Sequence, residues 1–211
     1  MLLDLGPEQR LGGSCLAQVY SQIGDVAPNI DDVSGFRALL ELIIQGKRQG
    51  DFLSLHDRSD GGLLACLLEM SFAGRLGLEI SIDASEALLE TLFNEAAGFV
   101  VQVSKATYAL LEASAPGRCL PVAKVRQDDR VVISHGDKIV ADYGRSELQQ
   151  TWAKTSYKMQ SMRDSTACAE EEYSSLAANR VDDPGLNAKL TFDPKEIPNV
   201  LTGVRPKIAV L

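Results

Sequence analysis

The stretch His56-Asp57-Arg58-Ser59-Asp60-Gly61-Gly62-Leu63 determines how the rest of the chain is interpreted. A short apolar run at residues 52–55 precedes it. Residues 63–70 form a second apolar run, which Gly74 closes. The apolar residues of this second run recur at helical spacing, so we expect a helix that belongs to the hydrophobic core. The local order is therefore strand, polar loop with two glycines, helix.

The loop has the residue types of a phosphate and metal site. A helix N-terminus offers free backbone N–H groups and a partial positive charge, which suit a phosphate, and glycines let a ligand approach the backbone. Asp57 and Asp60 supply the hard oxygen ligands that magnesium prefers. A simpler interpretation is that Asp57, Ser59 or Asp60 caps the helix and that the glycines only make the turn. The eight residues alone favour capping, so the functional interpretation depends on the surrounding sequence.

Length and charge argue against several classes of function. The chain has 211 residues, a formal net charge of -8 and 45% hydrophobic residues, which is typical of one globular domain with an extension. The acidic balance, without a dense cluster of Lys or Arg, argues against a nucleic-acid surface. No apolar run approaches the roughly 20 residues of a membrane span, and the N-terminus lacks a signal-peptide pattern. We therefore expect a cytoplasmic protein without nucleic-acid or membrane partners.

The cysteines and histidines are too scattered for a zinc site. The chain has 4 Cys and 2 His, and no two cysteines form a C-x-x-C pair. This pattern is typical of a reducing cytoplasm. The residues concerned are Cys15, Cys66, Cys119, Cys168, His56 and His135.

Predicted strands and helices alternate along most of the chain. Apolar residues alternate with polar residues or glycine over 76–82, as in a half-buried strand. The other expected elements are a strand at 1–6, helices at 15–20 and 33–44, a helix at 88–92, a strand at 99–103, a helix capped by Ser104, a strand at 119–125 and a hairpin turning at 135–137. This order predicts an α+β fold with layered α/β/α architecture and a mixed sheet.

The composition changes towards the C-terminus. Ser146 and Gln149 form a capping-box pattern, and four apolar residues then share one helical face: Leu148, Trp152, Met159 and Met162. Residues after 165 are rich in Ala, Ser, Asp, Asn and Pro, which predicts an extended chain with room for a short helix near 170–176. We divide the chain into an α/β subdomain at 1–145, a trailing helix at 146–164, an extended linker at 165–204 and a strand at 205–211.

In combination, these motifs resemble the phosphoribosylformylglycinamidine synthase family, in its long single-chain form. Asp-Gly-Gly alone would match many kinases and hydrolases, but the resemblance extends over essentially the whole chain in the order of the family. The stretches that carry it are 56–64, Leu92-Phe93-Asn94-Glu95 with Gly98, Trp152-Ala153 to Arg163-Asp164, Pro184-Gly185-Leu186 to Phe192-Asp193, and Arg205-Pro206-Lys207-Ile208-Ala209-Val210-Leu211.

The resemblance implies a role and a place within that enzyme. The family uses ATP to activate the amide oxygen of formylglycinamide ribonucleotide, and ammonia from glutamine then displaces phosphate. This chain looks like the C-terminal subdomain of the second aminoimidazole-ribonucleotide-synthetase-like unit, followed by the linker and the first strand of the glutaminase domain. By resemblance, Asp57 is expected to contact Mg²⁺ and Ser59 the nucleotide (ATP or ADP), at a structural site. His56 is expected to orient the loop or to fill space, and no residue is assigned a catalytic role.

We expect the chain to be a piece of a longer protein and to be inactive by itself. The family's glutaminase nucleophile would follow Leu211, and most of its ATP loop would precede Met1. The partners would be the other domains of the enzyme, and an exposed former interface would allow self-association. The alternative is a stand-alone, non-catalytic interaction or scaffold module of the same fold. Relatives such as selenophosphate synthetases share the superfamily but not the stretch 165–211.

Overall fold

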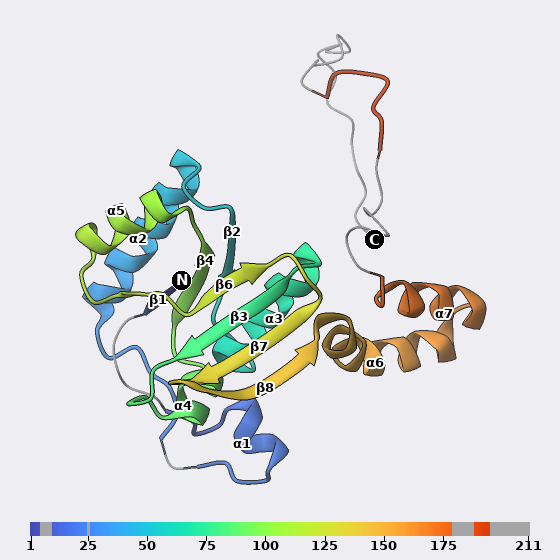
Figure 1. The fold of residues 1–211 in the computed structure, drawn as a ribbon, viewed down its shortest axis with the longest axis horizontal. Coiled ribbons are helices and arrows are strands. Elements are labelled where there is room, and N and C mark those ends of the chain that lie inside the picture. The colour runs from blue at the N-terminus through green and yellow to red at the C-terminus, as the bar shows by residue number, and fades with distance from the viewer. Residues whose placement is uncertain (5–9, 25, 179–187, 195–211) are drawn as a thin grey trace, which may run out of the picture.

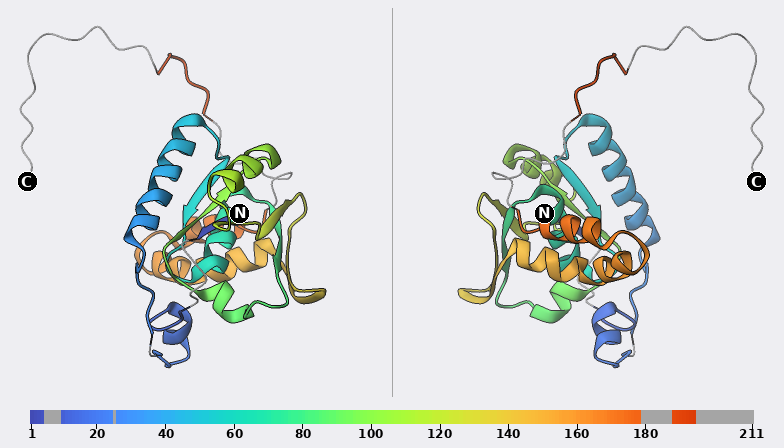
Figure 2. Two further views of the ribbon diagram at one scale, coloured as in Figure 1. Left: turned by 90° about the vertical axis from the view of Figure 1, so that its left-hand side faces the viewer. Right: turned by 90° about the vertical axis from the view of Figure 1, so that its right-hand side faces the viewer.

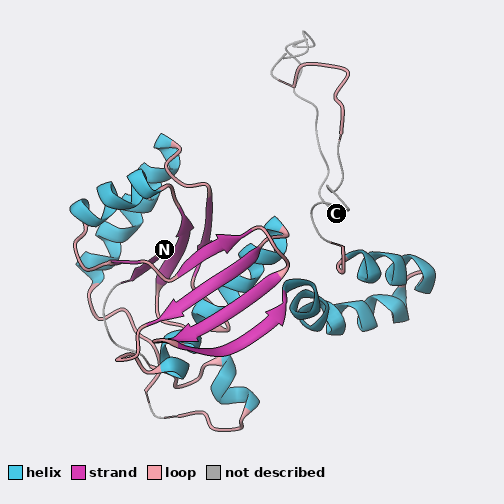
Figure 3. Cartoon of the chain, viewed as in Figure 1, coloured by secondary structure: helices cyan, strands magenta, loops and turns pink. Residues whose placement is uncertain are grey.

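The computed structural model describes residues 1–4, 10–24, 26–178 and 188–194 (Figure 1). Helices and strands are mixed along the described chain (Figure 3), so the predicted α+β class is confirmed. Among the described helices, none combines the length and apolar character that a membrane span requires. The elements are β1 (Leu2–Asp4), α1 (Cys15–Val19), α2 (Val33–Gln49), β2 (Ser54–Asp57), α3 (Gly62–Gly74), β3 (Gly77–Ile82), α4 (Leu88–Phe93), β4 (Gly98–Gln102), α5 (Lys105–Ser114), β5 (Cys119–Leu120), β6 (Ala123–Arg126), β7 (Arg130–His135), β8 (Lys138–Gly144), α6 (Arg145–Arg163) and α7 (Thr166–Ser175).

The described strands form two four-stranded sheets. The first has the order β2-β4-β1-β5, with every neighbouring pair antiparallel. The second has the order β6-β3-β7-β8 and is the mixed sheet, because β3 and β7 are parallel while the other pairs are antiparallel. The single strand expected over 119–125 is divided between the sheets. Pro121 lies at the division and has no N–H to donate to a ladder.

The first sheet is covered by helices on both faces. Consecutive residues of a strand point to opposite faces. Leu2 therefore packs with α3 and the second sheet, whereas Leu3 packs with α2 and α5. In β4, Val100 likewise packs on the side of α3, and Val101 packs on the side of α2 and α5. The sheet thus has the predicted α/β/α layering, and Figures 1 and 2 show α2 and α5 together on its outer side.

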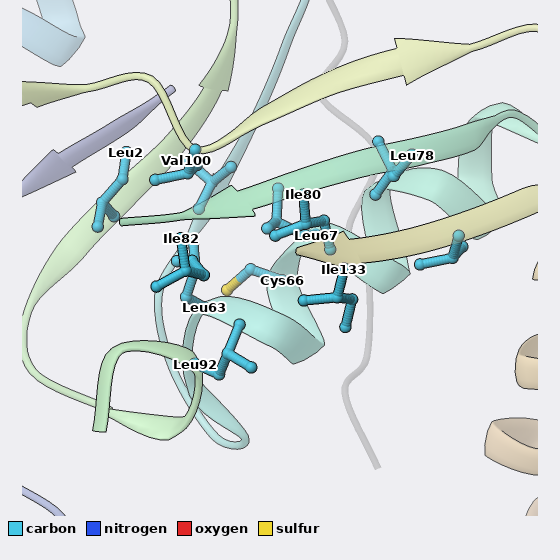
Figure 4. Close-up of a cluster of buried hydrophobic side chains, with 12 residues drawn as sticks. Leu2, Leu63, Cys66, Leu67, Leu78, Ile80, Ile82, Leu92, Val100 and Ile133 are labelled. Carbon is cyan, nitrogen blue, oxygen red and sulfur yellow. The ribbon is translucent and has the colours of Figure 1, made fainter. Parts of the chain in front are cut away.

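Helix α3 lies between the two sheets. Its side chains Leu63, Cys66 and Leu67 are buried and belong to one core cluster with Ile80 and Ile133 of the second sheet. Figure 4 shows this cluster, with α3 below the strands of the second sheet. The predicted core helix at 63–74 is confirmed. The motif loop is thereby placed at the end of the most deeply buried helix.

Helices α6 and α7 form a hairpin beside the end of β8 (Figure 1). The rings of Tyr157 and Tyr173 stack with centroids 4.3 Å apart, and the Tyr173 hydroxyl donates to the Gln150 carbonyl at 3.0 Å. Ala169 is buried against α6. The segment 166–175 is therefore a packed helix, which begins earlier than the short helix expected near 170–176 within the linker. The boundaries of the domains remain a prediction.

The start of α6 differs from the expected capping box. The N-cap is Gly144, which has no side chain, and Asp129 Oδ2 accepts from the Ser146 N–H at 3.3 Å in its place. The Ser146 hydroxyl instead donates to the Asp129 carboxylate at 2.5 Å. Arg145 is fully buried, and its Nε donates to Asp129 Oδ1 at 2.6 Å. The Asp129 carboxylate thus attaches this helix to the domain through an ion pair with buried Arg145 and through bonds to Ser146.

The apolar face expected along α6 is largely exposed. Leu148 packs partly against the core, and the Trp152 ring lies 5.8 Å from that of Phe72. Trp152 is nevertheless 62% exposed and Met162 is 89% exposed. Much of the expected linker, at 179–187 and 195–204, and the expected strand at 205–211 lie outside the described residues.

Candidate functional site

The motif loop connects the end of β2 to the start of α3. Asp57 ends β2 and its side chain is 68% exposed. Ser59 is also exposed, whereas Arg58 between them is buried. Because consecutive residues in an extended chain point to opposite sides, Asp57 and Ser59 lie on the same, solvent-facing side of the loop.

None of the polar side chains of the loop caps α3. The N-cap residue is Gly61, in the left-handed conformation with φ 82°, and no side chain makes a capping hydrogen bond. The turn is closed by the backbone instead, since the Gly62 N–H donates to the Ser59 carbonyl at 2.9 Å. The capping interpretation of Asp57, Ser59 and Asp60 is therefore wrong. Their side chains are exposed without being needed for the helix.

Gly62 is required by the close approach of α4. It has φ 69°, and a Cβ at this position would lie 2.6 Å from the Phe93 carbonyl carbon. Only glycine fits such a contact without moving the backbone. The loop is thus pressed directly on the end of α4.

Arg58 anchors the loop from the inside. Its side chain is only 2% exposed. The guanidinium donates to both carboxylate oxygens of Asp4, at 2.8 and 3.3 Å, and Nε donates to the Ala96 carbonyl at 2.6 Å. Its backbone N–H also donates to the Gly98 carbonyl at 2.8 Å. A planar fork is suited to this arrangement, because it satisfies a carboxylate and neighbouring carbonyls together.

Glu95 holds the other end of the loop. Its Oε1 accepts from the Gly61 N–H at 2.7 Å and from the Cys15 N–H at 2.8 Å. Gly61 is the N-cap of α3 and Cys15 is the first residue of α1, so one oxygen joins the starts of two helices.

His56 and Cys66 contact the backbone of Asp57. The Cys66 thiol donates to the Asp57 carbonyl at 2.9 Å, and His56 Nδ1 lies 2.6 Å from the same oxygen. His56 Nε2 lies 2.9 Å from Glu69 Oε2 on α3. His56 thus links β2 to α3, which is the arrangement expected of a residue that orients the loop.

The exposed side chains fit a hydrated magnesium ion and a phosphate. Mg²⁺ keeps several waters and is held by one or two carboxylates together with phosphate oxygens, and Asp57 offers such a carboxylate. The Ser59 hydroxyl, two residues later on the same side, can donate to a phosphate oxygen.

A second group of possible ligands lies next to the loop. Cys15, Asp60 and Glu95 have ligand atoms within 4.8 Å of one another. Burial, followed by the charge of Glu95, raises the pKa of the Cys15 thiol. A thiol must lose its proton to bind a metal, so this group is a poor metal site. The sequence predicted Asp57 and Asp60 as oxygen ligands of one magnesium site, whereas the Asp60 side chain lies with Cys15 and Glu95.

A cavity of about 530 Å³ lies on the inner side of Arg58, away from Asp57 and Ser59. It is lined by apolar residues of both sheets and by polar and charged residues. It does not enclose the two predicted site residues. The charged and amide side chains among its lining residues are Asp4, Arg58, Asp83, Glu86, Asn94 and Asp137.

Sequence reasoning missed Arg58 and Glu95 as parts of the site. Arg58 stands inside the motif, but its partners Asp4 and Ala96 are 54 and 38 residues away. Glu95 was noticed only as part of a resembling stretch, and it reaches Gly61 across 34 residues. No local pattern predicts such contacts. The one available signal was the family resemblance, because the stretch 92–98 is among those that carry it.

Comparison with known proteins identifies a family and several solved structures that are similar to this chain. Residues 2–135 match the family described as AIR synthase related protein, C-terminal domain. The structure of PurLQS from Thermotoga maritima is similar with a TM-score of 0.51 and 18% identity, over 59% of this chain and 23% of that chain.

Two structures of T. maritima PurL show the same likeness. The complex with ATP has a TM-score of 0.50 and 19% identity, over 57% of this chain and 23% of that chain. The complex with ADP has a TM-score of 0.50 and 20% identity, with the same two coverages. This chain therefore spans about a quarter of each of these proteins. Because the family match covers most of its sequence, the chain belongs to the AIR synthase related proteins and carries their C-terminal domain.

Proposed function

We propose that this chain supplies one wall of a magnesium–nucleotide site in a phosphoribosylformylglycinamidine synthase. Asp57 would hold the metal and Ser59 the nucleotide phosphate. The observation that carries the proposal is that both side chains are exposed on one side of a firmly anchored loop although neither caps α3. T. maritima PurL, which has the same fold, has been observed in complexes with ATP and with ADP.

The residues of this chain would bind and orient rather than react. The loop carries one exposed carboxylate suited to Mg²⁺ at Asp57, and Asp60 turns towards Cys15 and Glu95. One carboxylate leaves most of the magnesium coordination to water, phosphate and other parts of the enzyme. When bound, the Mg²⁺ neutralises phosphate charge. No residue described here is given a catalytic role.

The proposed enzyme converts formylglycinamide ribonucleotide to the amidine, with ATP and with ammonia from glutamine. We expect this chain alone to catalyse neither that step nor glutamine hydrolysis. Its four cysteines lie at the start of α1, within α3, in β5 and in α7, and none stands at the strand-to-helix turn that presents a nucleophile. Turnover of glutamine or ATP by the pure chain would contradict this.

We further propose a cytoplasmic location and contacts with the other domains of the enzyme.

The test is retention of nucleotide by the complete enzyme that contains this chain. Asp57→Asn keeps the shape of the side chain but removes the charge that attracts Mg²⁺. We expect this variant to lose bound nucleotide while its thermal unfolding in excess EDTA stays unchanged. Asp60→Asn is the matched control, because it removes a carboxylate from the same loop. Full retention in Asp57→Asn would contradict the proposal.

The scaffold alternative makes the opposite prediction. A module that keeps the fold without binding nucleotide would show equal behaviour for the two Asn variants and for the wild type. It would also show no magnesium-dependent binding.

A further inference from the structure

We infer that Glu95, which lies in the segment 93–98, is a positioning residue for the motif loop. It acts together with Arg58, which lies within that loop. This inference rests on the proposed function, because it concerns how Asp57 and Ser59 are held. Neither residue is assigned to the metal or the nucleotide itself.

The two anchors lie on either side of Ser59 and lead to one segment. Before Ser59, the Arg58 N–H and Nε donate to the Gly98 and Ala96 carbonyls at 2.8 and 2.6 Å. After Ser59, the Gly61 N–H donates to Glu95 at 2.7 Å. Movement of this part of the loop therefore requires breaking bonds at both ends. The loop takes its shape from the connection between α4 and β4.

The segment 93–98 is itself held in shape. Asn94 is only 2% exposed, and its Oδ1 accepts from the Ala96 N–H at 2.8 Å. A Cβ on Gly98 would lie 3.0 Å from the Leu3 carbonyl oxygen and 3.2 Å from Arg58 Nη2. The template on which the loop rests is thus packed against β1 and against the guanidinium.

Glu95 also determines where the loop stands relative to α1. Its Oε1 accepts two backbone N–H groups, and a carboxylate oxygen has lone pairs for both. Bonds to an ionised acceptor are stronger than neutral ones. Groups that hold a metal ligand in place typically change metal affinity about 10–100-fold when they are removed. Glu95 does not contact the proposed metal ligand itself, and it would act indirectly, through the backbone of the residues after Ser59.

The same contacts favour a positioning role for Glu95 over a direct role as a metal ligand. Its Oε1 is committed to two donors, and the Cys15 thiol beside it is disfavoured as a thiolate. A glutamine at this position keeps an oxygen that can accept both N–H groups. The two roles therefore differ in their response to Glu95→Gln.

The experiment uses the full 211-residue chain and four variants: Glu95→Ala, Glu95→Gln, Arg58→Lys and the control Glu90→Ala, which removes a carboxylate from α4 outside the 93–98 segment. Amide hydrogen exchange of Gly61 and Cys15 is measured first, without ligand. Titration with Mg²⁺ and ADP is then followed through the amide chemical shifts of residues 57–62. Thermal unfolding shows that each variant is folded.

We expect Glu95→Ala to accelerate exchange at Gly61 and Cys15 and to weaken the Mg²⁺–ADP response about tenfold or more. Glu95→Gln should keep both close to wild type, as should Glu90→Ala. Arg58→Lys should weaken the response from the other end of the loop, since an ammonium cannot replace the fork.

Two outcomes would overturn the inference. One is an unchanged titration in Glu95→Ala, and the other is loss of binding in Glu95→Gln equal to that in Glu95→Ala. Failure of the proposed function is distinguishable from both, because Asp57→Asn would then leave nucleotide retention by the complete enzyme unchanged while Glu95→Ala still accelerates exchange at Gly61 and Cys15.

Discussion

Helices α3 and α6 both carry apolar residues at helical spacing, but α3 is apolar over most of its surface and α6 only along a narrow stripe. Helix α3 lies between two sheets, and its residues Leu63, Cys66 and Leu67 are almost fully buried. Helix α6 is attached through Arg145 at its start, and Met159 and Met162 further along it are exposed. Apolar residues at helical spacing thus predict both helices, whereas the extent of burial follows how much of each helix surface is apolar.

The largest expected effect is in α3. Leu63→Ala should lower the free energy of unfolding by about 2–5 kcal/mol, because Leu63 is 0% exposed and packed sheets leave little room for collapse. Chemical denaturation measures this. Leu89→Ala on α4 is the control, since Leu89 is exposed. Equal losses in both variants would show that α3 is not the centre of the core.

The burial of α3 was predictable because its apolar residues cover more than one face. Leu64, Leu68 and Met70 pack against the same cluster from the sides, and a helix that is apolar nearly all round must be buried. Helix α6 has only a narrow stripe among polar residues, which suits a helix partner as well as a core.

Other features were predictable where their cause was local. The Ser104 cap of α5 is confirmed by its bond from the Thr107 N–H at 3.0 Å, and the hairpin at 135–137 joins β7 and β8. The division of 119–125 between two sheets was missed, as were the anchors Arg58 and Glu95. Their partners are distant in sequence, so neither propensity nor spacing reports them.

The second largest effect is expected where α6 is attached. Asp129→Asn leaves the buried Arg145 guanidinium without its charged partner. The loss should be at or below the lower end of about 3–5 kcal/mol, since Asp129 is itself partly exposed and screened. Unfolding of α6 is followed by far-UV circular dichroism.

The same pair has a defined pH dependence. Partial burial raises the pKa of Asp129, but hydrogen bonds from Ser146 and Arg145 outweigh it, so that the pKa lies below its ordinary value. The stabilisation is therefore complete above the unfolded-state pKa of about 3.9 and is lost as the pH falls through the lower folded-state pKa. The stability difference between wild type and Asp129→Asn should shrink on acidification below about pH 4. A difference that grew on acidification would contradict the assignment.

A smaller effect is expected between α6 and α7. Tyr173→Ala removes a stacked ring and the hydrogen bond to Gln150, which should cost about 1–2 kcal/mol of local stability. Amide exchange within α7 should accelerate while exchange within α3 stays constant. Tyr20→Ala is the control, because Tyr20 is exposed. Unchanged exchange in α7 would show that the hairpin does not depend on this contact.

The smallest effect is expected on the exposed face of α6. The double variant Met159→Ser and Met162→Ser should change the free energy of unfolding by no more than about 0.5 kcal/mol, because both side chains are exposed. Denaturation of dilute protein measures it. A loss comparable to that of Leu63→Ala would mean that another copy or segment covers this face.

The most direct test of the central claim locates the metal on the loop. Mn²⁺ accepts the same carboxylate ligands as Mg²⁺ and broadens the signals of nearby amides in the chain when added with ADP. We predict that the amides of Asp57 to Gly61 are broadened first, and that Asp57→Asn abolishes this effect while Asp60→Asn does not. Broadening centred on Cys15 and Glu95, or on the cavity residues Asp83 and Asp137, would contradict the assignment of the site to Asp57 and Ser59.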